Sequence, residues 1–253
     1  MLELSDITRA NIRRKIYHYV AAYARWSLLA LRQPNMALIV RLIQRRHLTY
    51  LDIAALTDLV NKVLEYEHRG IAGAFVEVGC GRGGSAIAIA CGKARTRAFY
   101  VYDAFTMIPP PSLQDGPDAH ARYATIVSGK AIGSGMTQYY GYENNLYDQV
   151  HQAFATFGLD PDTHAVHLMR GLFKDSLRPA FPIALAHIDC DWYESVMTAL
   201  ERIDPYLISG GTLIVDDYDH WSGCRRAVEE YLYHKGIDNY EYRPKSRLHI
   251  IKH

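Results

Sequence analysis

The sequence lacks the patterns that would assign it to several specialised classes of protein. Its 253 residues carry a formal net charge of +1 at pH 7, so no overall field favours nucleic acid or an acidic membrane as a partner. The 4 cysteines form no Cys-x-x-Cys pair, and we expect buried free thiols in a reducing cytoplasm. No apolar run approaches the ~20 residues of a membrane span, and the start shows no secretory signal. What is present is an ordinary globular composition, 49% hydrophobic and 22% charged.

The N-terminal part of the chain has the periodicity of helices. Apolar side chains recur at helical spacing from Ile12 to Leu29, and Pro34 is expected to end this helix before a second begins at Met36. A further helix is predicted over residues 52–69. Basic residues cover the opposite face, which is compatible with a membrane surface, but we favour packing on the core, covering of the active site or dimerisation. Residues 1–70 are therefore predicted to form a helical appendage.

From residue 71 onward, short apolar strands alternate with helices. This alternation predicts an α/β fold with a parallel sheet covered on both faces, in which ligands bind beyond the carboxyl ends of the strands. Residues 104–142 are rich in Pro, Gly, Asp and Tyr and are predicted to be irregular. The predicted strands are 74–78, 98–102, 165–169, 184–188, 212–215 and 248–251. The predicted helices are 84–94, 143–157, 193–206 and 224–235.

A glycine-rich turn follows the first predicted strand and opens a helix. Glycines permit a tight turn and a close approach of the backbone to a ligand. The spacing differs from the G-x-G-x-x-G of dinucleotide sites, and an acidic residue stands two positions before the first glycine. The stretch Glu77-x-Gly79-x-Gly81 therefore resembles motif I of class I methyltransferases, whose acidic residue helps to orient the ammonium of S-adenosylmethionine. Ser85, at the start of the helix, could donate to the methionine carboxylate.

Two further segments could contact S-adenosylmethionine at this turn. Asp103 ends the second predicted strand, where a carboxylate can accept hydrogen bonds from ribose hydroxyls; the alternative is a cap of a helix or turn. Phe173 follows the third strand and could pack on the adenine. Asp175 could accept from the adenine amino group, or could simply cap the segment that follows.

Acidic residues also end two later strands, as Asp189-Cys190-Asp191 and Asp216-Asp217. Carboxylates gathered at neighbouring strand ends repel one another unless they are protonated or bound to a cation, and oxygen ligands favour Mg²⁺ or Mn²⁺ over zinc. The alternative is a set of separate caps and solvated acids. A metal there could lower the pKa of a substrate hydroxyl, with Asp191, or His220 as second choice, taking the proton. His187, inside a strand, is expected to be a core residue.

Taken together, these segments resemble the macrocin O-methyltransferase (TylF) family, from about Thr49 to the C-terminus. The most specific stretches are 75–85, 171–177 and 187–195, together with Gly210-Gly211 and residues 215–218. The resemblance implies a Rossmann-like class I methyltransferase fold over residues 71–253, with a mostly parallel seven-stranded sheet and helices on both faces. It also implies Mg²⁺-dependent O-methylation of a hydroxyl group, usually on a sugar of a natural product.

The resemblance also implies roles for particular residues. It gives Asp189, Asp216 and Asp217 as metal ligands, and Asp191 or a histidine such as His220 as the base. Motif and resemblance together give the cofactor contacts as Glu77, Gly79, Gly81, Gly83, Ser85, Asp103, Phe173 and Asp175. A homo-oligomer, most simply a dimer, is expected. Residues 104–142, which would form the lid and acceptor pocket, differ from the sugar-modifying members, so the acceptor stays open.

Three other functions remain open from the sequence. Asp189-Cys190-Asp191 is a D-x-D motif, which holds a metal on a sugar diphosphate in glycosyltransferases, but this reading leaves residues 77–85 unexplained. A non-catalytic methyltransferase-like binding module would have no use for a buried acidic cluster, which is costly when nothing pairs with it. An NAD-dependent oxidoreductase would need a Tyr-x-x-x-Lys pair after the sheet, which does not occur in the expected place.

Overall fold

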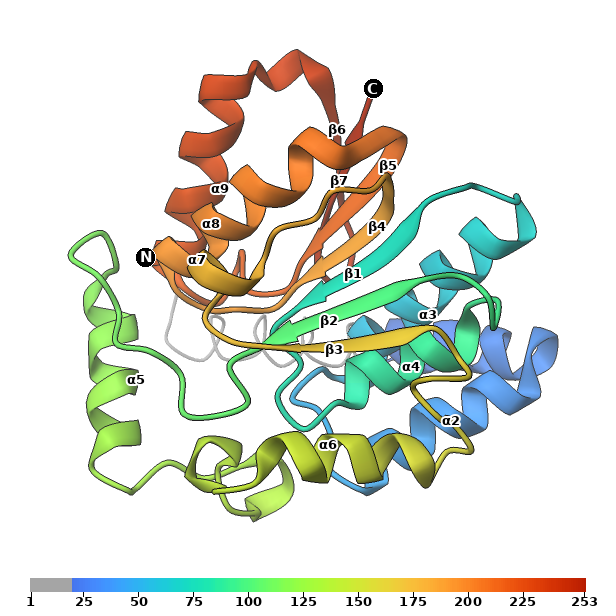
Figure 1. The fold of residues 1–253 in the computed structure, drawn as a ribbon, viewed down its shortest axis with the longest axis horizontal. Coiled ribbons are helices and arrows are strands. Elements are labelled where there is room, and N and C mark those ends of the chain that lie inside the picture. The colour runs from blue at the N-terminus through green and yellow to red at the C-terminus, as the bar shows by residue number, and fades with distance from the viewer. Residues whose placement is uncertain (1–19) are drawn as a thin grey trace, which may run out of the picture.

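A seven-stranded sheet forms the centre of the computed structural model, which describes residues 20–253 (Figure 1). The strand order is β3-β2-β1-β4-β5-β7-β6; the first five are parallel, β7 runs antiparallel to β5, and β6 runs antiparallel to β7. The strands are β1 Ala74–Val78, β2 Phe99–Asp103, β3 Val166–Arg170, β4 Ile183–Ile188, β5 Leu207–Val215, β6 Tyr240–Pro244 and β7 Leu248–Lys252. The chain runs outward from β1 to β3 and then returns to β4, so the order reverses between β1 and β4, where open α/β sheets bind their ligands.

Helices cover both faces of this sheet (Figure 1). One face packs against α2, α3, α4 and α6, and the other against α8 and α9, with a separate apolar cluster on each side. β1 and β4 are buried along their whole length, as expected for strands covered on both faces. The helices are α2 Pro34–Arg45, α3 Ile53–His68, α4 Gly84–Gly92, α5 Pro117–Val127, α6 Leu146–Ala155, α7 Phe173–Ser176, α8 Tyr193–Ile203 and α9 Ser222–Lys235.

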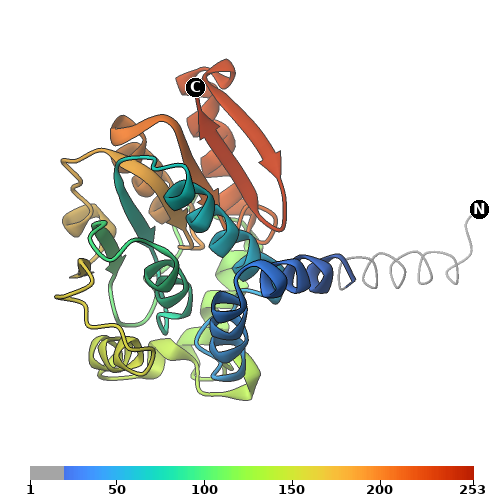
Figure 2. The same ribbon diagram turned by 90° about the vertical axis from the view of Figure 1, so that its right-hand side faces the viewer.

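The described part of the N-terminal region is helical, as predicted, and lies against α4 (Figure 2). Residues 20–32 form a helix that ends before Gln33, and α2 begins at Pro34, which confirms the predicted break. Proline suits the first position of a helix because its missing N–H would have no partner there. The predicted helical positions from Ile12 to Tyr19 lie outside the described residues. No helix among residues 20–253 has the length and apolar character needed to cross a membrane.

The prediction of free cysteines is confirmed. Cys80, Cys190 and Cys224 are buried, Cys91 is half-buried, and none forms a disulfide. Burial raises the pKa of each of these thiols, so they stay protonated and unreactive.

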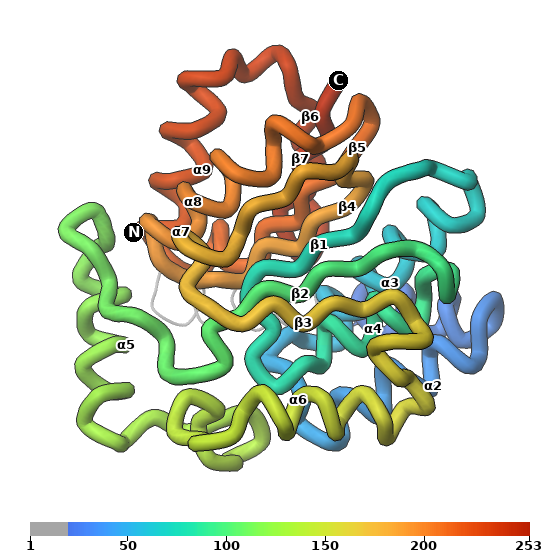
Figure 3. The backbone as a smooth tube through the Cα atoms, in the orientation of Figure 1, coloured from blue at the N-terminus to red at the C-terminus, as the bar shows by residue number. Residues whose placement is uncertain are grey.

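Helix α5, strand β6 and the short helix α7 were missed by the sequence analysis. Residues 104–142, predicted to be irregular, contain helix α5, which Gly116-Pro117-Asp118 opens with a proline and an acidic residue in its first turn. Strand β6 was missed because it is an edge strand that ends on Pro244, which edge strands tolerate and central strands do not. Figure 3 traces the segment 104–142 past the carboxyl ends of the parallel strands, so this segment forms one wall of the site described next.

Candidate functional site

Two adjoining cavities open at the carboxyl ends of β1, β2, β4 and β5. The carboxylate cavity, of about 290 Å³, is lined by the acidic residues that follow β4 and β5. The Phe173 cavity, of about 160 Å³, is lined by Phe173, its neighbours Leu172 and Lys174, and the start of α8. The residues common to both linings are Gly79, Asp103, Ile108, Tyr140, Asp189 and Asp191. A molecule in one cavity can therefore meet a molecule in the other at Asp189 and Asp191.

The glycine turn after β1 brings backbone directly against the segment after β4. Gly79 has a φ of +88°, and a Cβ atom at this position would lie 1.8 Å from the carbonyl oxygen of Asp189. Only glycine fits there, for conformation and for space alike. Gly79 lines both cavities and Gly81 lines the carboxylate cavity, whereas Gly83 packs toward Val150 of α6 and lines neither.

Asp103, at the end of β2, holds this turn in place. Its Oδ2 accepts from the N–H of Cys80 at 2.8 Å and of Gly81 at 3.1 Å, and its Oδ1 accepts from the N–H of Phe105 at 2.7 Å. Burial raises the pKa of Asp103, and these backbone N–H groups oppose the rise. Asp103 therefore caps this turn, as one of the two alternatives expected, and it also lines both cavities.

Three other predicted cofactor contacts line neither cavity. Glu77 is fully buried, and its Oε1 lies 2.8 Å from Nδ1 of His187, its neighbour in register on β4. Ser85 is buried within α4, and Asp175 is exposed on α7. Phe173, by contrast, is half-buried and lines the cavity named after it. The predicted cofactor contacts that face the Phe173 cavity are therefore Gly79, Asp103 and Phe173.

All of the predicted metal and base residues line the carboxylate cavity: Asp189, Asp191, Asp216, Asp217 and His220. Burial, reinforced by the neighbouring carboxylates, raises the pKa of Asp189 and of Asp217 well above the ordinary value. Like charges held together out of water favour either a proton or a cation between them.

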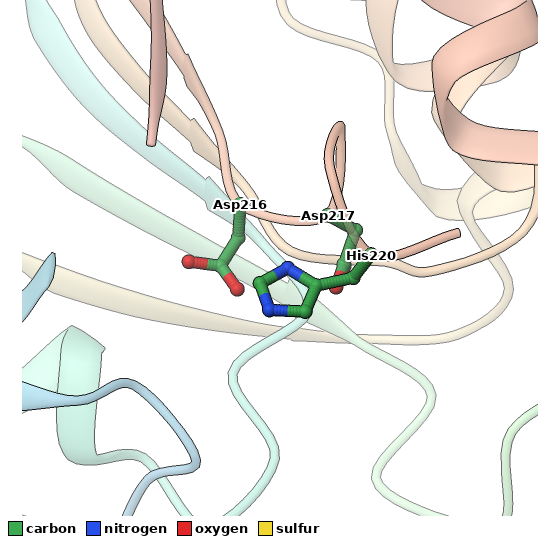
Figure 4. Close-up of side chains that lie close together, drawn as sticks. All are labelled: Asp216, Asp217 and His220. Atoms are coloured by element: carbon green, nitrogen blue, oxygen red, sulfur yellow. The ribbon is translucent and has the colours of Figure 1, made fainter. Parts of the chain in front are cut away.

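The tightest group of possible metal ligands comes from the loop after β5 (Figure 4). One ligand atom from each of Asp216, Asp217 and His220 lies within 4.8 Å of the others. This group contains two of the predicted metal ligands and the histidine considered as a base, but not Asp189. Arg247, which the sequence analysis missed, donates from Nε to Asp216 Oδ1 at 2.5 Å. Its cation therefore offsets part of the negative charge of the cluster.

Asp191 is fixed by its backbone and by one hydrogen bond. Its φ of +58° is left-handed, a conformation that costs a non-glycine residue about 1–3 kcal/mol and is typical of functional positions. Trp221 donates from Nε1 to Asp191 Oδ1 at 2.7 Å, and no other side chain among the described residues donates to this carboxylate. Burial raises the pKa of Asp191 to about 6, against the effect of the Trp221 hydrogen bond. Trp221 was missed because nothing in its sequence context indicates that α9 begins beside Asp191.

Aromatic rings form much of the remaining wall of the carboxylate cavity. Tyr139 and Tyr140, with ring centroids 4.5 Å apart, come from the segment 104–142, and Trp192 and Trp221 meet edge to face at 5.3 Å. Such rings offer flat apolar faces beside polar groups, which suits a molecule with both apolar and hydroxyl surfaces.

The chain is similar to known proteins over most of its length. Residues 45–241 match the macrocin-O-methyltransferase (TylF) family. Over 176 residues the chain is 34% identical to an 8-demethyl-8-(2,3-dimethoxy-α-L-rhamnosyl)-tetracenomycin-C 4'-O-methyltransferase of Streptomyces olivaceus, a match that covers 67% of this chain and 62% of that protein. It is 28% identical over 199 residues to the mycinamicin III 3''-O-methyltransferase of Micromonospora griseorubida, covering 76% and 72% of the two chains.

The solved structures give the same result for the fold. The O-methyltransferase NovP superposes with a TM-score of 0.66 at 25% identity, covering 81% of each chain. The calicheamicin methyltransferase CalS11 gives 0.59 at 20% identity, covering 92% of this chain and 91% of that one. These likenesses confirm the predicted class I methyltransferase fold.

Proposed function

The chain belongs to the macrocin O-methyltransferase (TylF) family, and we propose that it transfers a methyl group from S-adenosylmethionine to a hydroxyl group on the sugar of a natural product. The observation that carries this proposal is the pair of cavities that share Asp189 and Asp191. A methyl donor in one and an acceptor in the other would meet at these carboxylates. The relative from Streptomyces olivaceus is named for O-methylation of a rhamnosyl-tetracenomycin, which supports a glycosylated acceptor.

The Phe173 cavity fits the nucleoside end of S-adenosylmethionine. Phe173 offers a ring on which an adenine could stack, and the buried Asp103 borders the same space. Gly79 lets the cofactor approach the backbone closely and lies where the two cavities meet. In this orientation the methionine end would point toward the carboxylate cavity.

The carboxylate cavity also fits a divalent cation. Carboxylates that raise one another's pKa, with an imidazole nitrogen within 4.8 Å of an oxygen of two of them, are a donor set for Mg²⁺ or Mn²⁺. Asp189, Asp216 and Asp217 would hold the ion, with His220 beside them. When bound, the ion would lower the pKa of the acceptor hydroxyl.

Asp191 is proposed as the general base. Its Oδ1 is held by Trp221, which leaves Oδ2 to accept the proton of the acceptor hydroxyl. As the hydroxyl oxygen forms its bond to the methyl carbon, the bond from that carbon to sulfur breaks and its electron pair stays on sulfur. The products are the methyl ether, S-adenosylhomocysteine and a proton on Asp191. His220 is the second candidate for this role.

The first experiment measures binding and transfer with the purified chain. S-adenosylhomocysteine should raise the melting temperature, since a ligand that binds only the folded state stabilises it; no shift at a concentration of about 1 mM would remove the cofactor from the proposal.

Tritium from methyl-labelled S-adenosylmethionine should be transferred to a glycosylated acceptor. EDTA should stop this transfer, and added Mg²⁺ should restore it. Full activity in chelator would exclude the metal, and sugar transfer from a UDP-sugar would favour a glycosyltransferase instead. Light scattering tests the expected dimer.

A further inference from the structure

We propose that Arg122 of α5 binds an anionic group on the acceptor, so that the preferred substrate is a sugar carrying a carboxylate or a phosphate. This inference rests on the proposed function, because it assigns the acceptor to the carboxylate cavity. It concerns the wall of the cavity that α5 forms, opposite the acidic residues. Neither the metal nor the cofactor would contact this wall.

Arg122 lies on the inner face of α5. Ala119 and Ile126, three positions before it and four after it, are the buried residues of this helix, and Ile126 lines the carboxylate cavity together with Arg122. Residues at these spacings share one face of a helix. The inner face is thus apolar on both sides of Arg122 and carries one cation, which lies on the cavity instead of in open solvent.

The orientation of α5 is fixed at its start. Asp118, one turn before Arg122, accepts from the N–H of Ser222 at 2.8 Å and from its hydroxyl at 2.6 Å. Just before α5, Asp115 accepts from the N–H of Tyr193 at 2.8 Å. The first residues of α9 and α8 therefore hold this helix against the core, and a side chain one turn further along the same face points over the site.

Arg122 differs from the other arginines of the cavity in having no carboxylate partner among residues 20–253. Arg82 pairs with Glu143 at 3.1 Å, and Arg247 pairs with Asp216. The guanidinium of Arg122 instead lies 5.6 Å from the ring centroid of Tyr139, where it is half-buried. A guanidinium that lies over a ring and makes no ion pair keeps N–H groups free to donate to an oxyanion in a bidentate way.

The acidic residues across the cavity determine where such an anion could sit. An anionic group placed among Asp189, Asp216 and Asp217 would be repelled, whereas the hydroxyl to be methylated is needed there. An acceptor with its anion on Arg122 and its hydroxyl toward Asp191 satisfies both conditions. Arg122 and Asp191 line the same cavity.

The test compares ligands that differ in one group, with S-adenosylhomocysteine and Mg²⁺ present. 4-Nitrophenyl β-D-glucuronide against 4-nitrophenyl β-D-glucoside tests a carboxylate, and glucose 6-phosphate against glucose tests a phosphate. Affinity is measured by calorimetric titration, which needs no turnover. The wild type should bind the anionic member of at least one pair about 10- to 100-fold more tightly, as expected for a charge-assisted hydrogen bond. Arg122→Gln should remove that difference, and Arg122→Lys should keep part of it because it retains the charge.

Arg202→Gln is the matched control, because it removes one exposed cation from α8 outside both cavities and should leave all affinities unchanged. Equal binding of neutral and anionic ligands by the wild type would overturn the inference. So would an equal loss for both in Arg122→Gln, because that result would mean that Arg122 only offsets the charge of the acidic residues. If S-adenosylhomocysteine itself fails to bind while the anion preference persists, the proposed function fails, and Arg122 is shown to bind an anion that is not a methyl acceptor.

Discussion

Two groups of titratable side chains lie on the same sheet and have different surroundings. The first, at the carboxyl ends of β4 and β5, consists of Asp189, Asp191, Asp216 and Asp217 and opens into a cavity. The second, in the middle of the sheet, consists of Glu77, His187 and His249 and is covered completely. His187, in β4, belongs to the covered group, and Asp189, two residues later, belongs to the group that opens into the cavity. A position along the strand therefore decides whether an ionisable group faces a ligand or the core.

The covered group is paired incompletely. Glu77 and His187 bond to each other, but Oε2 of Glu77, Nε2 of His187 and both ring nitrogens of His249 have no hydrogen-bond partner among the described residues. Burial, with the nearby Lys245, Lys62 and His187, lowers the pKa of His249 to about 3. We expect changes in the covered group to alter stability, and changes in the open group to alter activity.

The largest expected effect is on the rate of methyl transfer. Asp191→Asn removes the proton acceptor but keeps an oxygen for Trp221, and asparagine tolerates the left-handed φ. We expect the rate to fall by about 10²- to 10⁴-fold. The melting-temperature shift with S-adenosylhomocysteine should stay as in the wild type. An unchanged rate would mean that His220, the second candidate, is the base. His220→Asn is therefore measured beside Asp191→Asn.

The second largest expected effect is a loss of stability when the covered group is changed. Glu77→Ala leaves the His187 ring buried without its partner, and we expect the free energy of unfolding to fall by about 3–5 kcal/mol. Urea denaturation measures this. The double variant Glu77→Leu/His187→Leu removes both polar groups and should recover most of the loss. If Glu77→Ala instead unfolds as the wild type does but no longer binds S-adenosylhomocysteine, Glu77 belongs to the cofactor site.

The pH dependence of stability should distinguish His249 from exposed histidines. Its pKa is about 3 when folded against an ordinary 6.5, so below pH 6.5 the unfolded chain takes up a proton that the folded protein does not. Stability is then lost as pH falls. Going from about pH 7.5 to about pH 5.5, this group alone should lower the free energy of unfolding by about 1.4 kcal/mol.

The control for this effect is a pair of variants. His249→Leu should abolish that part of the pH dependence, and His68→Gln, which changes an exposed histidine at the end of α3, should leave it in place. Parallel pH profiles for the wild type and His249→Leu would mean that the pKa of His249 is the same in the folded and the unfolded chain.

The smallest expected effect is an increase in stability. No hydrogen bond among the described residues holds the side chain of Asp189, and burial with the charges of Asp216 and Asp217 raises its pKa. Asp189→Asn should therefore stabilise the metal-free protein, by roughly 1 kcal/mol once solvent in the cavity is considered. Mg²⁺ should raise the melting temperature of the variant less than that of the wild type. A variant that is less stable without metal would show that the charge is compensated within the chain.

The sequence predicted the central sheet well because buried parallel strands are short apolar runs. The predicted strand 74–78 matches β1 at both ends, and the strands that lead to the acidic residues lie where expected. Strand β6 and helix α5 were missed for different reasons. The first is a half-exposed edge strand, and the second begins with a turn signal that also fits a loop.

The contacts within the site were predicted less well than the strands. They depend on the direction of side chains and on segments that are distant in sequence. Glu77 has the position of a cofactor-binding acid, but the strand register aligns it with His187. Trp221 and Arg247 reach Asp191 and Asp216 from elements that are distant in sequence. No local pattern encodes such a contact. By contrast, strand ends gather in any parallel sheet, so the acidic pairs were placed together by topology alone.

The attachment of α5 has a consequence for how acceptor preference could change. Asp115 and Asp118 bond to the first residues of α8 and α9, where helix N–H groups lack partners of their own, and Gly223 leaves the space that Asp115 needs. Each of these attachments includes a main-chain N–H group, which any residue except proline provides, and the hydroxyl of Ser222 adds a second hydrogen bond to Asp118. The segment 104–142 could therefore be exchanged as one unit. A relative's segment with aspartates at the positions of Asp115 and Asp118 could be grafted onto the same sheet.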